Sequence, residues 1–558
     1  MSTADIAPVD LAPAGPPVRR AQRVRVETGV IVLFVLTLLV LAAFVLYPTA
    51  SVLRYPALSD YVDGLTRPRL LTAARNSFII TLASTLGATF VGFVFAFAVT
   101  RRDIPGQRFF RLMGVLPLFA PPFMVAFAYI LMFGKQGLVS RHLLGLDLDI
   151  FGPAGLWLSQ TIAFFPLAMM IIRGVLEGVH PNAEQAALTL GATEATALRT
   201  VLLPLARPGL VGALLVVSIT VLADFGNAVV IAGNYPLLAT EAWFLMEGLA
   251  DLNAAAVVVS MLLVPTLALF LISRFVVGRR SFTTVTGRGA SVDQIRTPTP
   301  VKWITVGLCS LVSAFVITVY VGIVLAGLTE TWGSDWSLTL RHWLEAGQHM
   351  NAIWRSVLIS VLSGLVTASI GQIAAFLHSR DLPGRTLLDF LSVLPGALPG
   401  VFIGVGYVLA FNAPPLELAG TMWIIVLALG FWHLPQAYQA TAAALSQVSR
   451  SIEDAARDLG ASEIRVARDV YAPLLSRSLV ASFLQSFIRS VSNISVVVFL
   501  VAPGNVLVTF VILQMIGGAN WSGAAALTTV LLAITFVCVG LAQAIAGWSS
   551  PSTTGTRS

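Results

Sequence analysis

The sequence predicts an all-α polytopic membrane protein of about twelve transmembrane helices in two parallel six-helix repeats. Three observations predict this class. Of the 558 residues, 57% are apolar and only 11% are charged, against about 25% charged in soluble domains. The apolar residues gather in continuous runs of roughly the 20 residues that a helix needs to cross a bilayer. Motifs also recur at fixed spacings in the two halves. This composition excludes a disordered chain and an ordinary cytosolic enzyme.

The predicted elements, in order, are twelve membrane helices. Only helices and closed barrels satisfy the backbone in lipid, and continuous apolar runs favour helices because barrel strands alternate. The first run is long and starts far from residue 1, which favours an uncleaved helix over a signal peptide. The predicted helices begin near Val30, Leu70, Arg111, Gly155, Arg207, Asn253, Trp303, Ile353, Leu387, Leu418, Arg477 and Gly523.

The arginines predict the orientation. A basic tail with Arg19, Arg20, Arg23 and Arg25 precedes the first run. If this tail is cytoplasmic, alternation of the spans places most of the other arginines on the same side, as the positive-inside rule requires. We therefore expect a multi-pass protein of the bacterial inner membrane, surrounded by lipid, with both termini in the cytoplasm. The net charge of +7 then reflects topology and not a nucleic-acid partner.

Two motif pairs predict an internal duplication. EQAALTLG at 184–191 matches EDAARDLG at 453–460, and RDIPG at 102–106 matches RDLPG at 380–384, at offsets of 269 and 278 residues. Six spans is an even number, so the two halves insert in the same orientation. The predicted organisation is a cytoplasmic tail (1–29), a first repeat (30–277), a cytoplasmic linker (278–301), a second repeat (302–547) and a C-terminal tail (548–558).

The duplicated motif lies in a predicted cytoplasmic loop of each half. Glu184, Ala187 and Gly191 fall at helical spacing on one face, and Glu453, Ala456 and Gly460 repeat it. A face of small residues outside the membrane favours docking on a partner. A helix that lies on lipid headgroups would carry a broad face of Leu, Phe or Trp instead.

These residues resemble the signature loop of binding-protein-dependent ABC importer permeases. The resemblance implies a non-enzymatic permease whose loops contact a separate ATP-binding subunit, in two copies, and whose outer face receives solute from a periplasmic binding protein. It assigns ATPase coupling to Glu184, Ala187, Gly191, Pro204, Glu453, Ala456, Gly460 and Pro473. The chain itself has no GxxxxGK[ST] motif to hold ATP phosphates, so we expect it to bind no cofactor and the partner to use the ATP.

The solute is less sharply indicated. DFGN at 224–227 and GNYPLLATEAWF at 233–244 resemble the ferric-iron importer permeases in particular. Thiamine, aminoethylphosphonate and sugar-phosphate permeases share the general layout and remain alternatives. An ion-coupled secondary transporter is the alternative from another class, but it would not need docking motifs in two cytoplasmic loops.

Four polar residues inside predicted spans are candidates for the translocation pathway. Ionisable groups in a membrane are costly and suggest a pathway, and Asp224 and Arg489 are such groups. Our hypothesis is that Asp224, Asn227, Arg489 and Asn493 line the passage between the halves. A structural contact that locks helix packing is the open alternative. Cys309 and Cys538 lie apart in apolar runs, and we expect no metal site.

Overall fold

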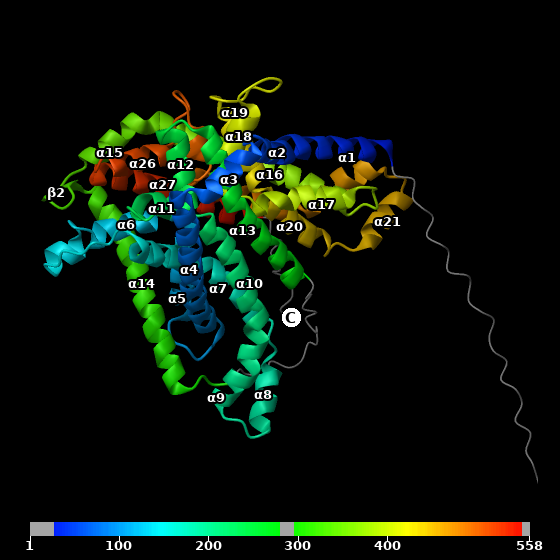
Figure 1. Cartoon of the computed structure of the whole chain (residues 1–558). Coiled ribbons are helices and arrows are strands. Elements are labelled where there is room, and N and C mark those ends of the chain that lie inside the picture. The colour runs from blue at the N-terminus through cyan, green and yellow to red at the C-terminus, as the bar shows by residue number, and fades with distance from the viewer. Residues whose placement is uncertain (1–26, 279–294, 549–558) are drawn as a thin grey trace, which may run out of the picture.

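The computed structural model describes residues 27–278 and 295–548 (Figure 1). Most of the two predicted tails and of the predicted linker, including Arg19, Arg20, Arg23 and Arg25, therefore lies outside the described residues. Within the described part of the chain, the only strands are β1 (Thr329–Thr331) and β2 (Asp335–Leu338), which pair antiparallel. The all-α polytopic class is confirmed.

Helices of the first half precede residue 279. They are α1 (Thr28–Leu41), α2 (Tyr47–Arg54), α3 (Leu58–Thr66), α4 (Pro68–Thr100), α5 (Gln107–Val115), α6 (Pro122–Phe133), α7 (Pro153–Glu177), α8 (Pro181–Thr189), α9 (Glu194–Ala197), α10 (Leu203–Leu222), α11 (Gly226–Ile231), α12 (Leu238–Trp243) and α13 (Leu252–Gly278).

Helices of the second half follow residue 294. They are α14 (Thr299–Gly327), α15 (Arg341–Ala346), α16 (Met350–His378), α17 (Arg385–Val393), α18 (Gly400–Phe411), α19 (Met422–Trp432), α20 (Leu434–Leu445), α21 (Arg450–Asp458), α22 (Glu463–Val466), α23 (Ala472–Leu474), α24 (Ser476–Val491), α25 (Val497–Leu500), α26 (Val508–Gly517) and α27 (Trp521–Trp548).

The number of long apolar helices is smaller than the twelve runs suggested. Among the described residues, nine helices are long and apolar enough to cross a membrane, or ten if α17 and α18, bent by 114°, form one span. The run predicted from Leu418 is divided into α19 and α20 because Pro435 has no backbone N–H with which to continue the helix. The run predicted from Arg477 corresponds to α24, which has only 16 residues.

The duplication recurs in the helix boundaries. α5 (Gln107–Val115) and α6 (Pro122–Phe133) recur 278 residues later as α17 (Arg385–Val393) and α18 (Gly400–Phe411). α8 and α9 recur 269 residues later as α21 and α22. The boundaries of these four helices therefore repeat at the offsets of the motifs, whereas α7 of the first half corresponds to the divided pair α19 and α20.

Each half receives the first helix of the other. α14 belongs to the second half by sequence, yet it packs along α4, α5 and α6 of the first. α1 in turn packs on α16 and α17 of the second half, and Phe34 and Leu41 are buried there. Figure 1 shows α8 and α21 at the ends of two diverging arms, with α14 along one arm and α1 along the other.

The two halves meet in one continuous apolar core. The rings of Phe225 and Phe499 lie 6.2 Å apart between their centroids. A Cβ on Gly226 would lie only 3.4 Å from a methyl group of Ile494. Residues from both halves therefore share this junction, and movement of one half displaces the other.

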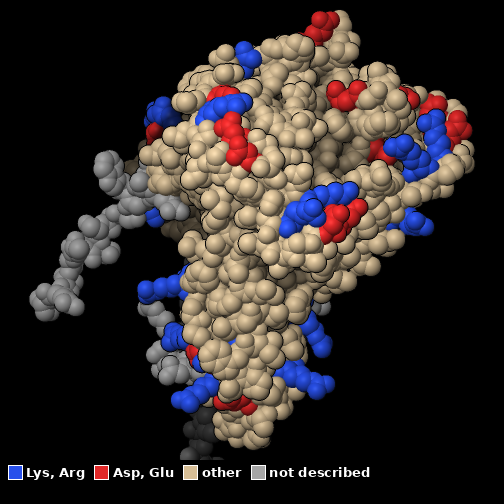
Figure 2. All heavy atoms as spheres, turned by 90° about the vertical axis from the view of Figure 1, so that its left-hand side faces the viewer, with Lys and Arg blue, Asp and Glu red and all other residues tan. Residues whose placement is uncertain are grey.

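Charge is unevenly distributed between the two ends of the bundle. Figure 2 shows basic side chains around the narrow end that carries α8, largely uncharged surface next to it, and most of the acidic side chains of this face at the broad end. A band of uncharged surface between polar ends suits a protein embedded in a membrane.

Two long helices, α4 and α7, approach each other closely at Gly92 of α4, and this contact generates a stability prediction. A Cβ there would lie 2.6 Å from the Cβ of Ala168 and 2.8 Å from the backbone N of Met169 in α7. We expect Gly92→Ala to lower the thermal stability of the detergent-solubilised protein, because overpacking costs about 1–3 kcal/mol.

The matched control is Gly174→Ala on α7, where an added Cβ meets nothing within 4 Å. Because alanine favours helices over glycine by about 1 kcal/mol, this variant should be neutral or slightly more stable. Equal melting temperatures for the two variants would contradict the prediction.

Candidate functional site

The duplicated motif forms a short helix with a well-defined end in each half. Pro181 begins α8, where its missing N–H costs no hydrogen bond. Gly191 ends it with φ +87°, a backbone conformation that glycine adopts without strain. The N–H of Ala192 donates to the carbonyl of Ala187 and that of Gly191 to Leu188, at 3.0 and 2.9 Å. This is the hydrogen-bond pattern of a glycine-terminated helix.

The second half repeats this geometry. Gly460 follows α21 with φ +80°. The N–H of Ala461 donates to the carbonyl of Ala456, and that of Gly460 to Arg457. Both positions are open, since an added Cβ would meet nothing within 4 Å, so it is the backbone conformation that requires glycine.

A buried ion pair anchors α8 to the membrane helices. Both guanidinium nitrogens of Arg101, the residue directly after α4, donate to the carboxylate of Glu184 at 2.8 and 2.6 Å. Both side chains are only 4% exposed. The Arg101 guanidinium also lies 5.3 Å from the ring centroid of Phe97, one turn earlier in α4. We call this arrangement the first clamp.

A larger network takes the same place in the second half. Arg380 donates to Glu453 and lies 4.4 Å from the ring centroid of Phe376. The hydroxyl of Tyr471 and the guanidinium of Arg457 also donate to Glu453, each at 2.5 Å. We call this arrangement the second clamp.

Glu463 extends the second clamp. It accepts a hydrogen bond from Arg457 at 2.5 Å, and its other oxygen lies 3.3 Å from Arg380. Burial alone would raise the pKa of Glu453, but the hydrogen bonds from Tyr471 and Arg380 outweigh it and hold that pKa below the ordinary value. The carboxylate therefore stays charged at neutral pH.

The clamp arginines were not identified from the sequence. The RDIPG and RDLPG motifs pair Arg102 with Arg380, yet in the structure Arg101 is the counterpart of Arg380. Each clamp arginine follows a phenylalanine by four residues, as Phe97–Arg101 and Phe376–Arg380. This Phe-x-x-x-Arg spacing is the signal that could have found them, because i and i+4 side chains meet on a helix.

The residues predicted to form the docking face lie against the helix bundle, because the clamps hold them there. Glu184 is buried and Ala187 is half-buried against the bundle, so the opposite side of α8 is free. At the ends of the two helices, Leu190 and Leu459 occupy equivalent positions and are both 89% exposed. The exposed leucines, which the sequence reasoning missed, are the apolar groups that this segment presents outward.

The two motif prolines follow a local change of helix. A π-helical turn precedes each, at Leu198–Leu202 and at Ala467–Tyr471. Pro204 is the second residue of α10, and Pro473 is the second residue of α23. A proline cannot donate to the preceding turn, so a wider turn at this point lets the chain enter the next helix without a forced kink.

Three of the four predicted pathway residues are buried, and their side chains form hydrogen bonds. Asp224 accepts from the side chain of Gln160 at 3.0 Å and from the backbone and side chain of Asn227 at 3.3 and 3.1 Å. Ser84 donates to Gln160 at 2.8 Å. This chain of contacts joins α4, α7 and the break between α10 and α11.

The second half has an equivalent break. Asn493 is also buried, and its side-chain oxygen accepts from the backbone of Val496 at 3.0 Å, as Asp224 does from Asn227. Asp224 and Asn493 therefore close the turns that precede α11 and α25 at corresponding positions. Arg489 differs from the other three because its side chain is exposed. The structure thus brings Asp224 and Asn227 together and leaves Arg489 apart, with no ion pair to Asp224 among the described residues.

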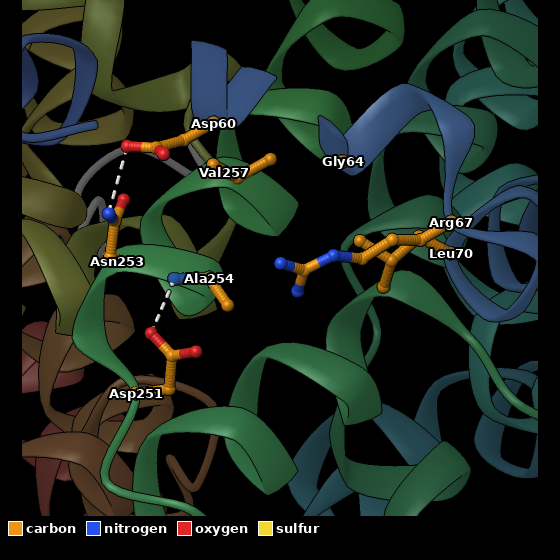
Figure 3. Close-up of a pocket in the computed structure, with 8 residues that line it drawn as sticks. All are labelled: Asp60, Gly64, Arg67, Leu70, Asp251, Asn253, Ala254 and Val257. Carbon is orange, nitrogen blue, oxygen red and sulfur yellow. Dashed lines mark hydrogen bonds between the residues drawn. The ribbon is translucent and has the colours of Figure 1, made fainter. Parts of the chain in front are cut away.

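A small polar pocket lies at the opposite end of the bundle from α8. It has a volume of about 60 Å³, enough for a few water molecules. Figure 3 shows Asp60 joined to Asn253, Asp251 joined to the backbone of Ala254, and Arg67 pointing inward from the start of α4. The hydrogen bond from Asn253, helped by that from the backbone of Ala57, lowers the pKa of Asp60. The pocket thus ties α3 to α13 through charged hydrogen bonds.

Across residues 27–278 and 295–548, no three His, Cys, Asp or Glu side chains come together in a way that could hold a metal ion.

The sequence that builds the two anchored helices is similar to sequences of known proteins. Residues 367–554 match the family described as the binding-protein-dependent transport system inner membrane component. The putative ferric transport system permease protein FbpB 1 of Haemophilus influenzae is 30% identical over 488 residues, which cover 83% of this chain and 77% of that protein. The chain belongs to this permease family.

Other relatives agree on the class of protein. The ferric transport system permease protein FbpB of Actinobacillus pleuropneumoniae is 29% identical to the permease, over 90% of this chain and 76% of its own. The putative 2-aminoethylphosphonate transport system permease protein PhnV of Salmonella choleraesuis is 28% identical, over 40% of this chain and 87% of its own. The permease is thus a multi-pass membrane transport protein.

The first clamp of the permease generates the second prediction. We expect Glu184→Gln to raise hydrogen exchange at the amides of α8 by at least about 100-fold, because removing one partner of a buried ion pair costs about 3–5 kcal/mol. Hydrogen exchange read by mass spectrometry on the solubilised permease measures this.

Two further variants make the test specific. Glu177→Gln removes the exposed partner of Arg173 at the end of α7, 2.7 Å away, and exposed helix pairs contribute only about 0.3–0.5 kcal/mol. The double variant Arg101→Met with Glu184→Met should recover part of the protection, since it leaves no unpaired charge. If Glu177→Gln loosened α8 as much as Glu184→Gln, the anchoring role would be wrong.

Proposed function

We propose that this chain is the permease subunit of an ATP-driven importer that passes a solute, best supported as ferric iron, from a periplasmic binding protein to the cytoplasm. In this proposal α8 and α21 each dock on one copy of an ATP-binding subunit. The basic end of the bundle, which carries α8, faces the cytoplasm, in line with the positive-inside rule. Both termini lie on that side.

The observation that carries this proposal is the pair of clamped helices. Leu190 and Leu459 stand 89% exposed at the ends of α8 and α21. An exposed leucine at the end of an anchored helix suits insertion into an apolar pocket of a partner, because burying a leucine side chain contributes about 1.5–3 kcal/mol. An isolated occurrence would mean little, but the same residue is exposed to the same extent in both halves.

The clamps supply the mechanical step of the proposal. α4 has 33 residues and spans about 50 Å, so it extends across the membrane. Because Arg101 holds Glu184 at its end, a force on α8 passes directly into α4. Arg380 and Glu453 do the same for α16. When the ATP-binding subunits close, the two arms move together, and the shared core around Phe225 and Phe499 transmits the change between inward-open and outward-open states.

The coupling roles follow from this arrangement. Glu184 and Glu453 act by holding their helices, Ala187 and Ala456 allow close packing, and Gly191 and Gly460 end the helices so that the leucines project. Pro204 and Pro473 lead the chain back into the membrane.

Two classes of cargo have support from relatives. Ferric iron rests on permeases named for ferric transport that align with most of this chain. A phosphonate rests on relatives that align with 40% of it. The ion-coupled secondary transporter is disfavoured because it gives the two exposed leucines and their clamps no role.

The exposed leucines generate the third prediction. The double variant Leu190→Asp with Leu459→Asp should lose co-purification with the ATP-binding subunit, with affinity reduced at least about 30-fold, as expected for loss of an apolar anchor. Because both side chains project into solvent, the permease itself should fold and melt as before.

Leu58→Asp is the control for added surface charge. Leu58 is 82% exposed on α3, at the other end of the bundle, and its replacement should leave co-purification unchanged. Retained binding by the double variant would refute docking through the leucines, and equal loss in Leu58→Asp would show a general effect of charge.

A further inference from the structure

One face of α24 is exposed and polar. Arg477, Ala481, Gln485 and Arg489 follow one another at intervals of four residues, and all four are exposed. We call them the α24 stripe. At a rise of 1.5 Å per residue the stripe extends over about 18 Å, more than half of the hydrocarbon thickness.

The exposed face of α4 shows what a lipid-facing surface of this protein looks like. Phe78, Leu82, Leu86 and Phe90 stand at the same four-residue intervals and are also exposed. The two faces share their spacing and differ in chemistry. An exposed apolar face is stable in contact with lipid hydrocarbon. Placing an arginine in the middle of the bilayer costs about 2.5–3.5 kcal/mol of insertion free energy. The α24 stripe therefore faces water.

The duplication shows that this polarity is not a general feature of the helix. The four corresponding positions of α10, 269 residues earlier, are Pro208, Gly212, Val216 and Thr220. They carry no charge and no amide. The second half thus contributes charged and amide side chains where the first half contributes uncharged ones. This difference is expected if only the second half binds the solute.

The stripe leads to the junction between the halves. Arg489 lies one turn before Asn493, and the next residue, Ile494, contacts Gly226 of the first half. Solutes cross transporters at the interface between repeats, near the middle of the membrane. The end of the stripe adjoins this interface between the two halves.

Among the described residues, no carboxylate forms an ion pair with Arg489. Asp224, the acidic residue predicted to share the passage with it, is hydrogen-bonded to Gln160 and Asn227 instead. Gln485 stands one turn away on the same face and adds an amide donor. An exposed guanidinium and an amide on the wall of a water-filled passage, where the surrounding protein and lipid have a low dielectric constant, together attract oxygen-bearing anions.

We propose that the α24 stripe lines the passage and that Arg489 and Gln485 contact a negatively charged cargo through its carboxylate or phosphonate oxygens. The anion is either the solute itself or the chelator that surrounds a metal ion. This inference rests on the proposed importer function and deepens it by naming the charge of what crosses.

Cysteine labelling tests whether the stripe faces water. Gln485→Cys and Leu86→Cys are made in a background with Cys309 and Cys538 replaced by serine and alanine, in the complete importer. A membrane-impermeant, negatively charged thiosulfonate should label the Gln485→Cys variant and not the Leu86→Cys variant. Adding Arg489→Gln should slow this labelling about tenfold and leave labelling by a neutral reagent unchanged. Equal labelling of both sites, or a rate independent of Arg489, overturns the proposal.

Uptake tests the cargo. Cells that express the complete importer are given radiolabelled ferric citrate or 2-aminoethylphosphonate. Arg489→Gln should lower uptake about tenfold or more, as for loss of a charged hydrogen bond, while Arg489→Lys should retain part of it. Arg207→Gln, an exposed arginine at the start of α10, is the control and should be neutral. Loss with ferric citrate identifies a chelate, and loss with the phosphonate identifies a free anion.

The two levels of inference fail differently. If the unmodified importer shows no uptake of either probe and no ATP hydrolysis stimulated by its binding protein, the importer function is wrong. If it takes up a probe and Arg489→Gln takes up the same amount, the importer stands and the anionic contact is wrong.

Discussion

The structure depends on burying a carboxylate and a guanidinium together at the end of one long membrane helix in each half, α4 and α16. Taking two such charges out of water costs several kcal/mol per ion, and only a close, well-hydrogen-bonded geometry offsets it. The bidentate contact of Arg101 with Glu184 has that geometry. A buried pair of this kind is weak evidence for stability, since apolar residues would pack as well. The pair does fix the position of α8 relative to α4, because its hydrogen bonds are directional. A non-directional apolar contact would allow α8 to shift.

The two clamps both hold a buried glutamate, but they differ in the number of side chains that contact it. The first has one donor and one acceptor, both nearly inaccessible. In the second, Glu453 accepts from Arg380, Arg457 and Tyr471, and Glu463 provides a second carboxylate. In this network the loss of one contact leaves Glu453 with other donors, whereas the two hydrogen bonds that hold Glu184 both come from Arg101. The two clamps therefore hold corresponding helices with different numbers of contacts.

Much of this arrangement could be predicted from the sequence, and the exceptions have physical causes. Recurring motifs predicted which segments of the two halves correspond, and Gly191 and Gly460 do occupy equivalent positions, where φ above zero favours glycine. The face of Glu184 and Ala187 was predicted to dock on a partner, yet it faces the bundle. Helical spacing shows which residues share a face and not which neighbour that face meets. Arg101 was missed because the motif match selected Arg102. The exchange of α1 and α14 between halves leaves no trace in composition, since apolar helices are alike in sequence whichever surface they cover.

The scarcity of charge makes each charge inside the bundle informative. Asp224 is enclosed by donors and gives the passage little negative potential, while Arg489 is exposed beside the junction of the halves. A bare ferric ion would be repelled at that point, because like charges a few ångströms apart in a weakly polar site interact by several kcal/mol. A ferric ion surrounded by carboxylates carries the opposite sign and would be attracted. The similarity to ferric permeases and the positive charge of the α24 stripe therefore agree only if the permease contacts a ferric complex whose net charge is negative. The stripe would then meet the chelating groups and not the metal ion itself.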